Sequence, residues 1–183
     1  LAQYFGALEA DPLAYQPRGK ALLGRGALRI TELAAQQVQA AGPEIEKLRD
    51  AWLVSRGSTE LGFLSRSRPL ENAPSKRFFA AFAGDRLDAL LTAVPLAQPG
   101  VWYFMDVIRH PESRPGTMEC LQIDSMRALH KEGAVEVRLG LCPLTGLDRE
   151  QDWRARLAAR LLPRFEFLYG FSSARRFKEK LGP

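Results

Sequence analysis

The chain has 183 residues, 46% of them hydrophobic and 26% charged, which is typical of a folded globular domain and excludes disorder, collagen and coiled coils. Its net charge is +5, and residues 154–180 carry eight basic side chains against two acidic ones, which suggests an anionic partner such as tRNA, phospholipid headgroups or a phosphorylated small molecule. The alternative is a solvated helix face. With two cysteines and two histidines, it lacks the ligand pairs of a zinc site and the framework of a disulfide-rich protein, which fits a reducing compartment. No stretch approaches the roughly 20 apolar residues of a membrane span.

The first half of the chain predicts a strand, a helix and a hairpin. Residues 28–33 suit a short strand, and Pro43 at a first helical position predicts an amphipathic helix that ends near Ser55. Residues 61–65 suit another short strand. The hairpin is predicted from two apolar runs on either side of a Gly-Asp turn, at residues 77–83 and 87–95.

The second half predicts a strand, a helix and a strand, with a further helix at 153–162. Residues 101–108 are dense in β-branched and aromatic side chains, as in a strand buried on both faces. A helix over 117–131 follows and stops at Gly133, and residues 134–141 predict an adjacent central strand. This order resembles the acetyltransferase-like (GNAT) fold, an α/β fold with a mixed sheet flanked by helices.

Asp106 and Arg109 are the first candidate site residues. Two-residue alternation places Asp106 on one face of its strand with three apolar residues, Trp102, Phe104 and Ile108. A buried carboxylate needs a partner, and Arg109 is the nearest candidate. We expect a charged site at the carboxyl end of this strand, where open α/β sheets place ligands; the alternative is a structural ion pair.

Glu119 lies within the apolar arc of the helix over 117–131, so we expect it to point inward and to act as a base or position an amine. The alternative is a simple partner of the helix dipole. His130 is expected in the core and His110 at the surface. Neither histidine has a serine and a carboxylate at the spacing of a serine hydrolase motif, so the sequence does not predict such a triad. Residues 113–118 depart from the glycine-rich pyrophosphate loop of acetyl-CoA-dependent relatives of this fold, because Pro115 lacks an N–H donor, so we expect no acetyl-CoA binding.

Four motifs carry a family resemblance over residues 52–183. They are W-L-x-x-R-G-x-x-E-x-G-F at 52–63, D-x-x-R-x-P at 106–111, L-G-x-x-P-L-T at 139–145, and Y-x-F-x-x-x-R-x-F-K-E-K-x-x-P at 169–183. On these residues the chain resembles the carboxyl-terminal region of the phosphatidylglycerol lysyltransferases, and it looks closest to their shorter soluble relatives.

The resemblance implies a transferase that moves lysine or alanine from aminoacyl-tRNA to a hydroxyl of a phospholipid such as phosphatidylglycerol, without metal or cofactor. It implies that residues 1–42 are the remnant of a preceding GNAT-like lobe and residues 43–183 the GNAT-like catalytic domain. Asp106, Arg109 and Glu119 would line the catalytic site. The expected substrate contacts are Thr145, Tyr169, Arg175, Lys178 and Lys180, the last three with phosphate of lipid or tRNA.

The implied location is cytoplasmic, at the inner face of the membrane. The start at Leu1 suggests that an upstream portion was removed, and any membrane segment of the full-length protein would have been removed with it. Two alternatives remain open. One is a GNAT-like acyltransferase that acts on a small amine or hydroxyl. The other is a non-catalytic module that binds anions or lipid.

Overall fold

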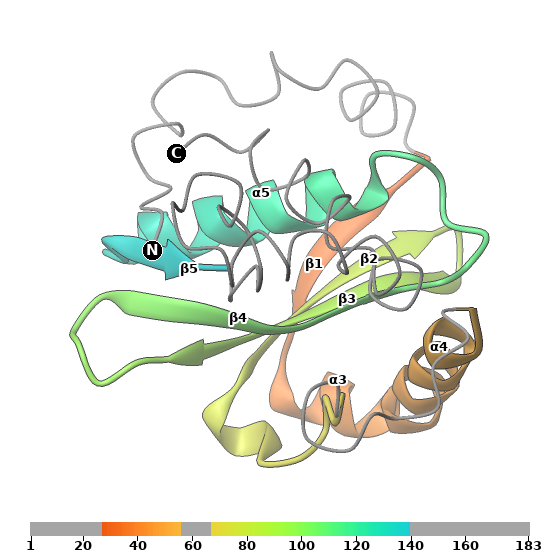
Figure 1. The fold of residues 1–183 in the computed structure, drawn as a ribbon, viewed down its shortest axis with the longest axis horizontal. Helices are drawn as coiled ribbons and strands as arrows, with labels where there is room; N and C mark the ends of the chain where they lie inside the picture. The colour runs from red at the N-terminus through yellow and green to blue at the C-terminus, as the bar shows by residue number, and fades with distance from the viewer. Residues whose placement is uncertain (1–26, 56–66, 140–183) are drawn as a thin grey trace, which may run out of the picture.

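The computed structural model describes residues 27–55 and 67–139, which form a sheet with helices on both faces (Figure 1). The strands are β1 (Arg29–Leu33), β2 (Arg77–Ala83), β3 (Arg86–Pro95), β4 (Val101–Arg109) and β5 (Glu136–Arg138). The helices are α3 (Ala35–Ala40), α4 (Gly42–Ser55), α5 (Thr117–Lys131) and the 3-10 turn η1 (Ala73–Ser75). Within these residues the strand order is β1-β2-β3-β4-β5, with antiparallel pairs up to β4 and a parallel pair β4–β5.

Most predicted elements in the described residues are confirmed. The strand over 28–33, the helix to Ser55, the hairpin, the strand over 101–108 and the helix over 117–131 are all present. Helix α3 was missed. β5 pairs with β4 as predicted, but it is the last strand of the sheet in the described part, so its expected central place is not seen there. The predictions for 61–65 and 153–162 lie outside the described residues.

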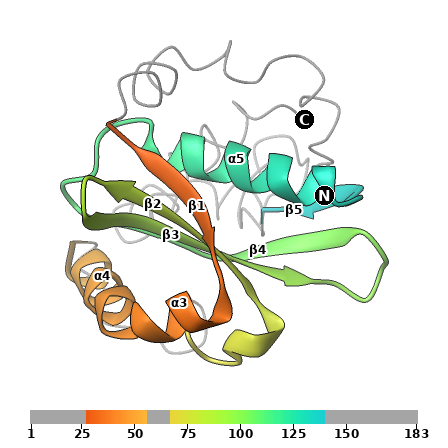
Figure 2. The ribbon, with the colours of Figure 1, turned by 180° about the vertical axis from the view of Figure 1, so that it is seen from behind.

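The sheet separates two apolar clusters. α5 covers one face, while α3 and α4 cover the other (Figures 1 and 2). On the α5 face, Phe79, Leu91 and Phe104 pack with helix residues such as Leu121 and Leu129. The opposite face joins Phe78, Leu90 and Ile108 of the strands to Val38, Ile45 and Leu48 of the helices. Full burial of one such side chain stabilises the fold by about 1.5–3 kcal/mol, so both helical layers are firmly held.

A bulge in β4 corrects the predicted face of Asp106. Thr92 of β3 pairs with Asp106, but the next residue of β3 pairs with Phe104, which leaves Met105 as an extra residue. Because one extra residue reverses the alternation, Phe104 faces α5 whereas Asp106 and Ile108 face the other side. The prediction that Asp106 shares a face with Trp102 and Phe104 is therefore wrong.

Arg77 ties three elements together at the surface. Its guanidinium donates to Glu32 of β1 from Nε and Nη2, both at 2.6 Å, and to Glu132, just beyond α5, from Nη1 and Nη2 at 2.6 and 2.8 Å. The group also lies over the rings of Phe79 and Trp102, 5.5 and 5.4 Å from their centroids. These contacts raise the pKa of Arg77, mainly through its hydrogen bonds with Glu32.

Candidate functional site

Asp106 belongs to a cluster of buried polar side chains on the face covered by α3 and α4. Ser67 Oγ donates to Asp106 Oδ1 at 3.0 Å, and Thr92 Oγ1 donates to Oδ2 at 2.8 Å. Thr92 Oγ1 also accepts the Asp106 backbone N–H at 3.0 Å, which satisfies a donor displaced by the bulge. Lys76 Nζ is 3.7 Å from Oδ2, and the Lys76 and Asp106 side chains are 5% and 6% exposed. We call Ser67, Lys76, Thr92 and Asp106 the Asp106 cluster.

Lys76 extends this cluster to the backbone of the segment before β2. Its ammonium donates to the carbonyl oxygens of Arg68 and Pro69, both at 3.1 Å. A buried ammonium requires such partners, because transfer of an unpaired charge into the protein interior is costly. Sequence reasoning missed Lys76, since a lysine before a strand ordinarily reads as a solvated charge.

Arg109 does not pair with Asp106. Its Nη1 donates to Ser113 Oγ at 3.0 Å, and the residue as a whole is exposed. Val107 packs in the cluster on the α5 face, and alternation places Arg109 on the same side as Val107. The predicted ion pair is therefore wrong, and the partner of Asp106 is Lys76.

Glu119 is half-buried in the first turn of α5, on the side of the sheet opposite the Asp106 cluster. The structure therefore does not bring the three predicted catalytic residues into one cavity. The helix starts after Gly116, whose φ of 101° gives a left-handed N-cap without a side-chain hydrogen bond. Thr117 Oγ1 is buried and has no hydrogen-bond partner in the described part of the chain. The Thr117 N–H donates to the Arg114 carbonyl oxygen at 3.1 Å, but no side chain caps this turn. The helix dipole and the remaining first-turn amides make this end of α5 favourable for negative charge.

Two side chains of α5 have raised pKa values. Burial raises the pKa of the Cys120 thiol to about 11, and the charges of Asp124 and Glu119 act in the same direction. Burial also raises the pKa of Asp124, against the effect of Arg127. The raised pKa and the burial of Cys120 both disfavour the reactive thiolate form.

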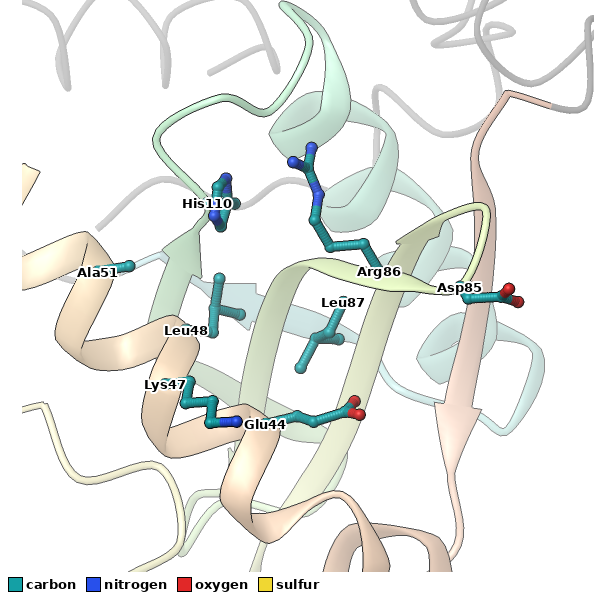
Figure 3. A pocket seen from close by; sticks show the side chains of 8 residues that line it. All are labelled: Glu44, Lys47, Leu48, Ala51, Asp85, Arg86, Leu87 and His110. Carbon is teal, nitrogen blue, oxygen red and sulfur yellow. The ribbon is translucent and has the colours of Figure 1, made fainter.

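The cavities on the α3 and α4 side include the following pair, both lined by residues of the described ranges. One, of about 380 Å³, lies between α4, the β2–β3 turn and the end of β4 (Figure 3). Its lining is Glu44, Lys47, Leu48, Ala51, Asp85, Arg86, Leu87 and His110. The other, of about 460 Å³, is largely apolar and includes Leu33, Val38, Phe78 and Lys76. Neither cavity is lined by Asp106, Arg109 or Glu119.

The histidine predictions fail in opposite directions. His130, expected in the core, is exposed, with Nδ1 3.2 Å from the Ala134 carbonyl oxygen. His110, expected at the surface, is partly buried, and its Nδ1 accepts the Glu112 N–H at 3.2 Å. No group of three His, Cys, Asp or Glu residues within 27–55 and 67–139 is arranged to hold a metal ion.

The five predicted substrate contacts, Thr145, Tyr169, Arg175, Lys178 and Lys180, lie outside the described residues. The predicted domain boundary between residues 42 and 43 also stays a prediction. β1 precedes this boundary, yet it pairs with β2 in the same sheet. Among the helices of the described ranges, none combines the length and apolar character needed to span a membrane.

Comparisons with known proteins agree with the fold. The structure aligns with the C-terminal domain of a candidate lysylphosphatidylglycerol synthetase from Agrobacterium fabrum, with a TM-score of 0.71 and 20% identity over 95% of this chain and 51% of that chain. It also aligns with L-PGS from Bacillus licheniformis, with a TM-score of 0.69 and 19% identity over 96% of this chain and 52% of that one. Together with the strand order, these likenesses confirm the predicted α/β class, a mixed sheet flanked by helices.

The sequence comparisons identify the family. A phosphatidylglycerol lysyltransferase of Bacillus subtilis (strain 168) is 30% identical over 145 residues, which cover 76% of this chain and 16% of that protein. The family described as phosphatidylglycerol lysyltransferase, C-terminal, matches residues 23–183. Because this match covers most of the sequence, the chain belongs to the C-terminal family of the phosphatidylglycerol lysyltransferases.

Proposed function

We propose that this chain carries the transfer site of an aminoacyltransferase that moves an amino acid from aminoacyl-tRNA to a hydroxyl of phosphatidylglycerol. The observation that carries the proposal is the family match over residues 23–183. The amino acid is of the lysine or alanine class, and the reaction takes place at the inner face of the cell membrane. The chain spans 16% of its Bacillus subtilis relative, so the activity is proposed for the protein in which this chain occurs.

The reaction exchanges one ester for another. The lipid hydroxyl oxygen attacks the aminoacyl carbonyl carbon, a new C–O bond forms, and the bond to the tRNA ribose oxygen breaks. The hydroxyl proton passes to a base and then to the departing ribose oxygen. Because the aminoacyl ester is already activated, the protein must mainly orient the two substrates, accept a proton and exclude water.

Glu119 and Arg109 are suited to direct roles. Both belong to the α5 side of the sheet and stand at either end of the loop from β4 to α5. We assign the base to the half-buried Glu119 carboxylate. Arg109, the end of α5 near Thr117, and the basic residues Arg175, Lys178 and Lys180 are assigned to phosphate.

The test combines lipid analysis with a purified assay. Lipid extracts of cells that express the full-length protein are expected to contain an aminoacylated phosphatidylglycerol, absent from cells with the empty vector. With phosphatidylglycerol vesicles and lysyl-tRNA or alanyl-tRNA, Glu119→Gln is expected to lower kcat/KM by about 10²–10⁴-fold, as for a general base. The control Glu112→Gln alters an exposed loop carboxylate and should leave transfer unchanged.

Two results would overturn the proposal. One is wild-type protein that binds such vesicles but forms no aminoacylated lipid with either donor, which supports a non-catalytic module. The other is micromolar binding of acetyl-CoA together with acetylation of a small amine, which supports the acyl-CoA alternative.

A further inference from the structure

We propose that Lys76 and Asp106 are positioning residues of the transfer site, which clamp residues 67–70 against β4, and that Asp106 does not act as the base. The inference rests on the proposed function for its catalytic consequence. Its structural part, the clamp, stands on the contacts of the Asp106 cluster.

Two links join residues 67–70 to β4, and both end on the carboxylate of Asp106. The first is direct, because Ser67 Oγ donates to Asp106 Oδ1 across 39 positions of the sequence. The second passes through Lys76, whose ammonium holds the Arg68 and Pro69 carbonyls while it faces Asp106 Oδ2. The Arg68 carbonyl also accepts the Glu71 N–H at 3.1 Å, so the same atom closes the turn that follows. Loss of either link should therefore loosen this turn.

The surroundings of Asp106 argue against a proton acceptor for substrate. The residue is 7% exposed, and both carboxylate oxygens accept hydrogen bonds from side chains of the protein itself. The carboxylate also faces the buried Lys76 ammonium, 3.7 Å from Oδ2. A lipid hydroxyl would also have to displace Ser67 to reach Oδ1.

The position of Arg109 links the clamp to the reaction. The bulge at Met105 interrupts the regular pairing of β3 and β4 two residues after Tyr103, the last residue of β4 that pairs with β5. The Thr92 hydroxyl binds both the backbone and the carboxylate of Asp106 there. Asp106 thus fixes the backbone of the residues at the end of β4. Arg109 is the last of these residues. A displacement of about 1 Å at a substrate-positioning group can lower a rate by about 100-fold.

The test uses two single variants, each with a matched control. Ser67→Ala removes one link and keeps the buried ion pair; Ser75→Ala is its control, because Ser75 Oγ bonds only locally to the Asn72 carbonyl. Lys76→Met removes the second link; its control is Lys47→Met, an exposed lysine of α4. We measure hydrogen exchange of the Glu71 amide, and kcat and KM for lipid transfer per folded protein.

A double variant keeps the test decisive if Lys76→Met does not fold. Lys76→Met with Asp106→Leu removes both charges, and apolar replacement of a whole buried pair is often tolerated. We expect faster exchange at Glu71 in Ser67→Ala and in the double variant. We expect transfer to fall by between about tenfold and 100-fold in both, while the two controls match the wild type.

The outcomes separate this inference from the proposed function. Wild-type exchange at Glu71 in Ser67→Ala and in the double variant would overturn the clamp, whether or not the protein transfers amino acids. A stable double variant with wild-type transfer would show that the cluster only stabilises the fold. If Asp106→Asn alone abolishes transfer while Ser67→Ala has no effect on it, Asp106 is the base and the positioning role fails. Absence of wild-type transfer refutes the proposed function, and the exchange measurement still decides the clamp.

Discussion

Replacement of Arg77 by Met tests how strongly a surface network ties the sheet to α5. Met keeps an apolar stem of similar length and removes the guanidinium, which is bound to Glu32 and Glu132 and stacked near two rings. The two carboxylates are 38% and 60% exposed, so solvent screens them, and each ion pair contributes about 0.5–1 kcal/mol despite its two-point geometry. The ring contacts add about 0.5 kcal/mol each.

Arg77→Met should therefore lower the free energy of unfolding by about 2 kcal/mol. For a chain of this length the midpoint of thermal unfolding should fall by about 4–8 °C. Urea denaturation followed by circular dichroism measures this difference in the free energy of unfolding. Arg77→Lys keeps the charge but loses the planar guanidinium, so its stability should lie between those of the wild type and Arg77→Met. In 1 M NaCl the difference in stability between the wild type and Arg77→Met should be smaller, because salt screens exposed charges.

The pH dependence has a definite sign. The hydrogen bond from Arg77 lowers the pKa of Glu132 below its ordinary value of 4.5. The stability that this bond contributes is therefore present above about pH 4.5 and is lost as the pH falls through the lower pKa of the folded state. The difference in stability between wild type and Arg77→Met should narrow in that acidic range by the share that the Glu132 bond contributes. A gap below about 0.5 kcal/mol, or one that is independent of both salt and pH, would refute the assigned role of the network.

Two further predictions concern single positions. Gly100→Ala should destabilise the fold by about 1 kcal/mol more than Gly84→Ala, because both residues have positive φ but only at Gly100 would the new Cβ meet a neighbour, Val135 Cγ2 at 3.1 Å; equal urea midpoints would contradict this. In a Cys142→Ser background, the thiol of Cys120 should react with a disulfide reagent at pH 8 only as fast as the protein unfolds, since it is 1% exposed with a pKa of about 11. Labelling that is faster than unfolding would show that α5 opens locally.

The sequence predicts the elements well where apolar periodicity and glycine agree. The helix over 117–131 matches α5 because an apolar arc is bounded by Gly116 and Gly133, both of which have positive φ in the structure. α3 was missed, because in its six residues only Val38 is buried and no amphipathic repeat is completed. Local patterns thus identify long helices and strands but overlook a helix as short as α3.

The site was less predictable, because its partners are distant in sequence. A one-residue bulge gives no signal in the apolar pattern, yet the one at Met105 reverses the face of Asp106. The choice of Lys76 over Arg109 as its partner depends on how β2, β3 and β4 line up, which no local spacing reveals. Glu119 was expected to point inward and is half-buried, whereas its role as a base stays a prediction.

The order of the strands in the sheet has a consequence for how the chain folds. β1 to β4 are neighbours in space in the order of the chain, and β2, β3 and β4 are joined by short turns, so little loop-closure entropy opposes their pairing. The parallel pair of β4 and β5 can form only after α5 has crossed the sheet. We therefore expect the meander to form early and β5 to dock late, so that substitutions at the β4–β5 junction accelerate unfolding while those in the β2–β3 hairpin slow folding.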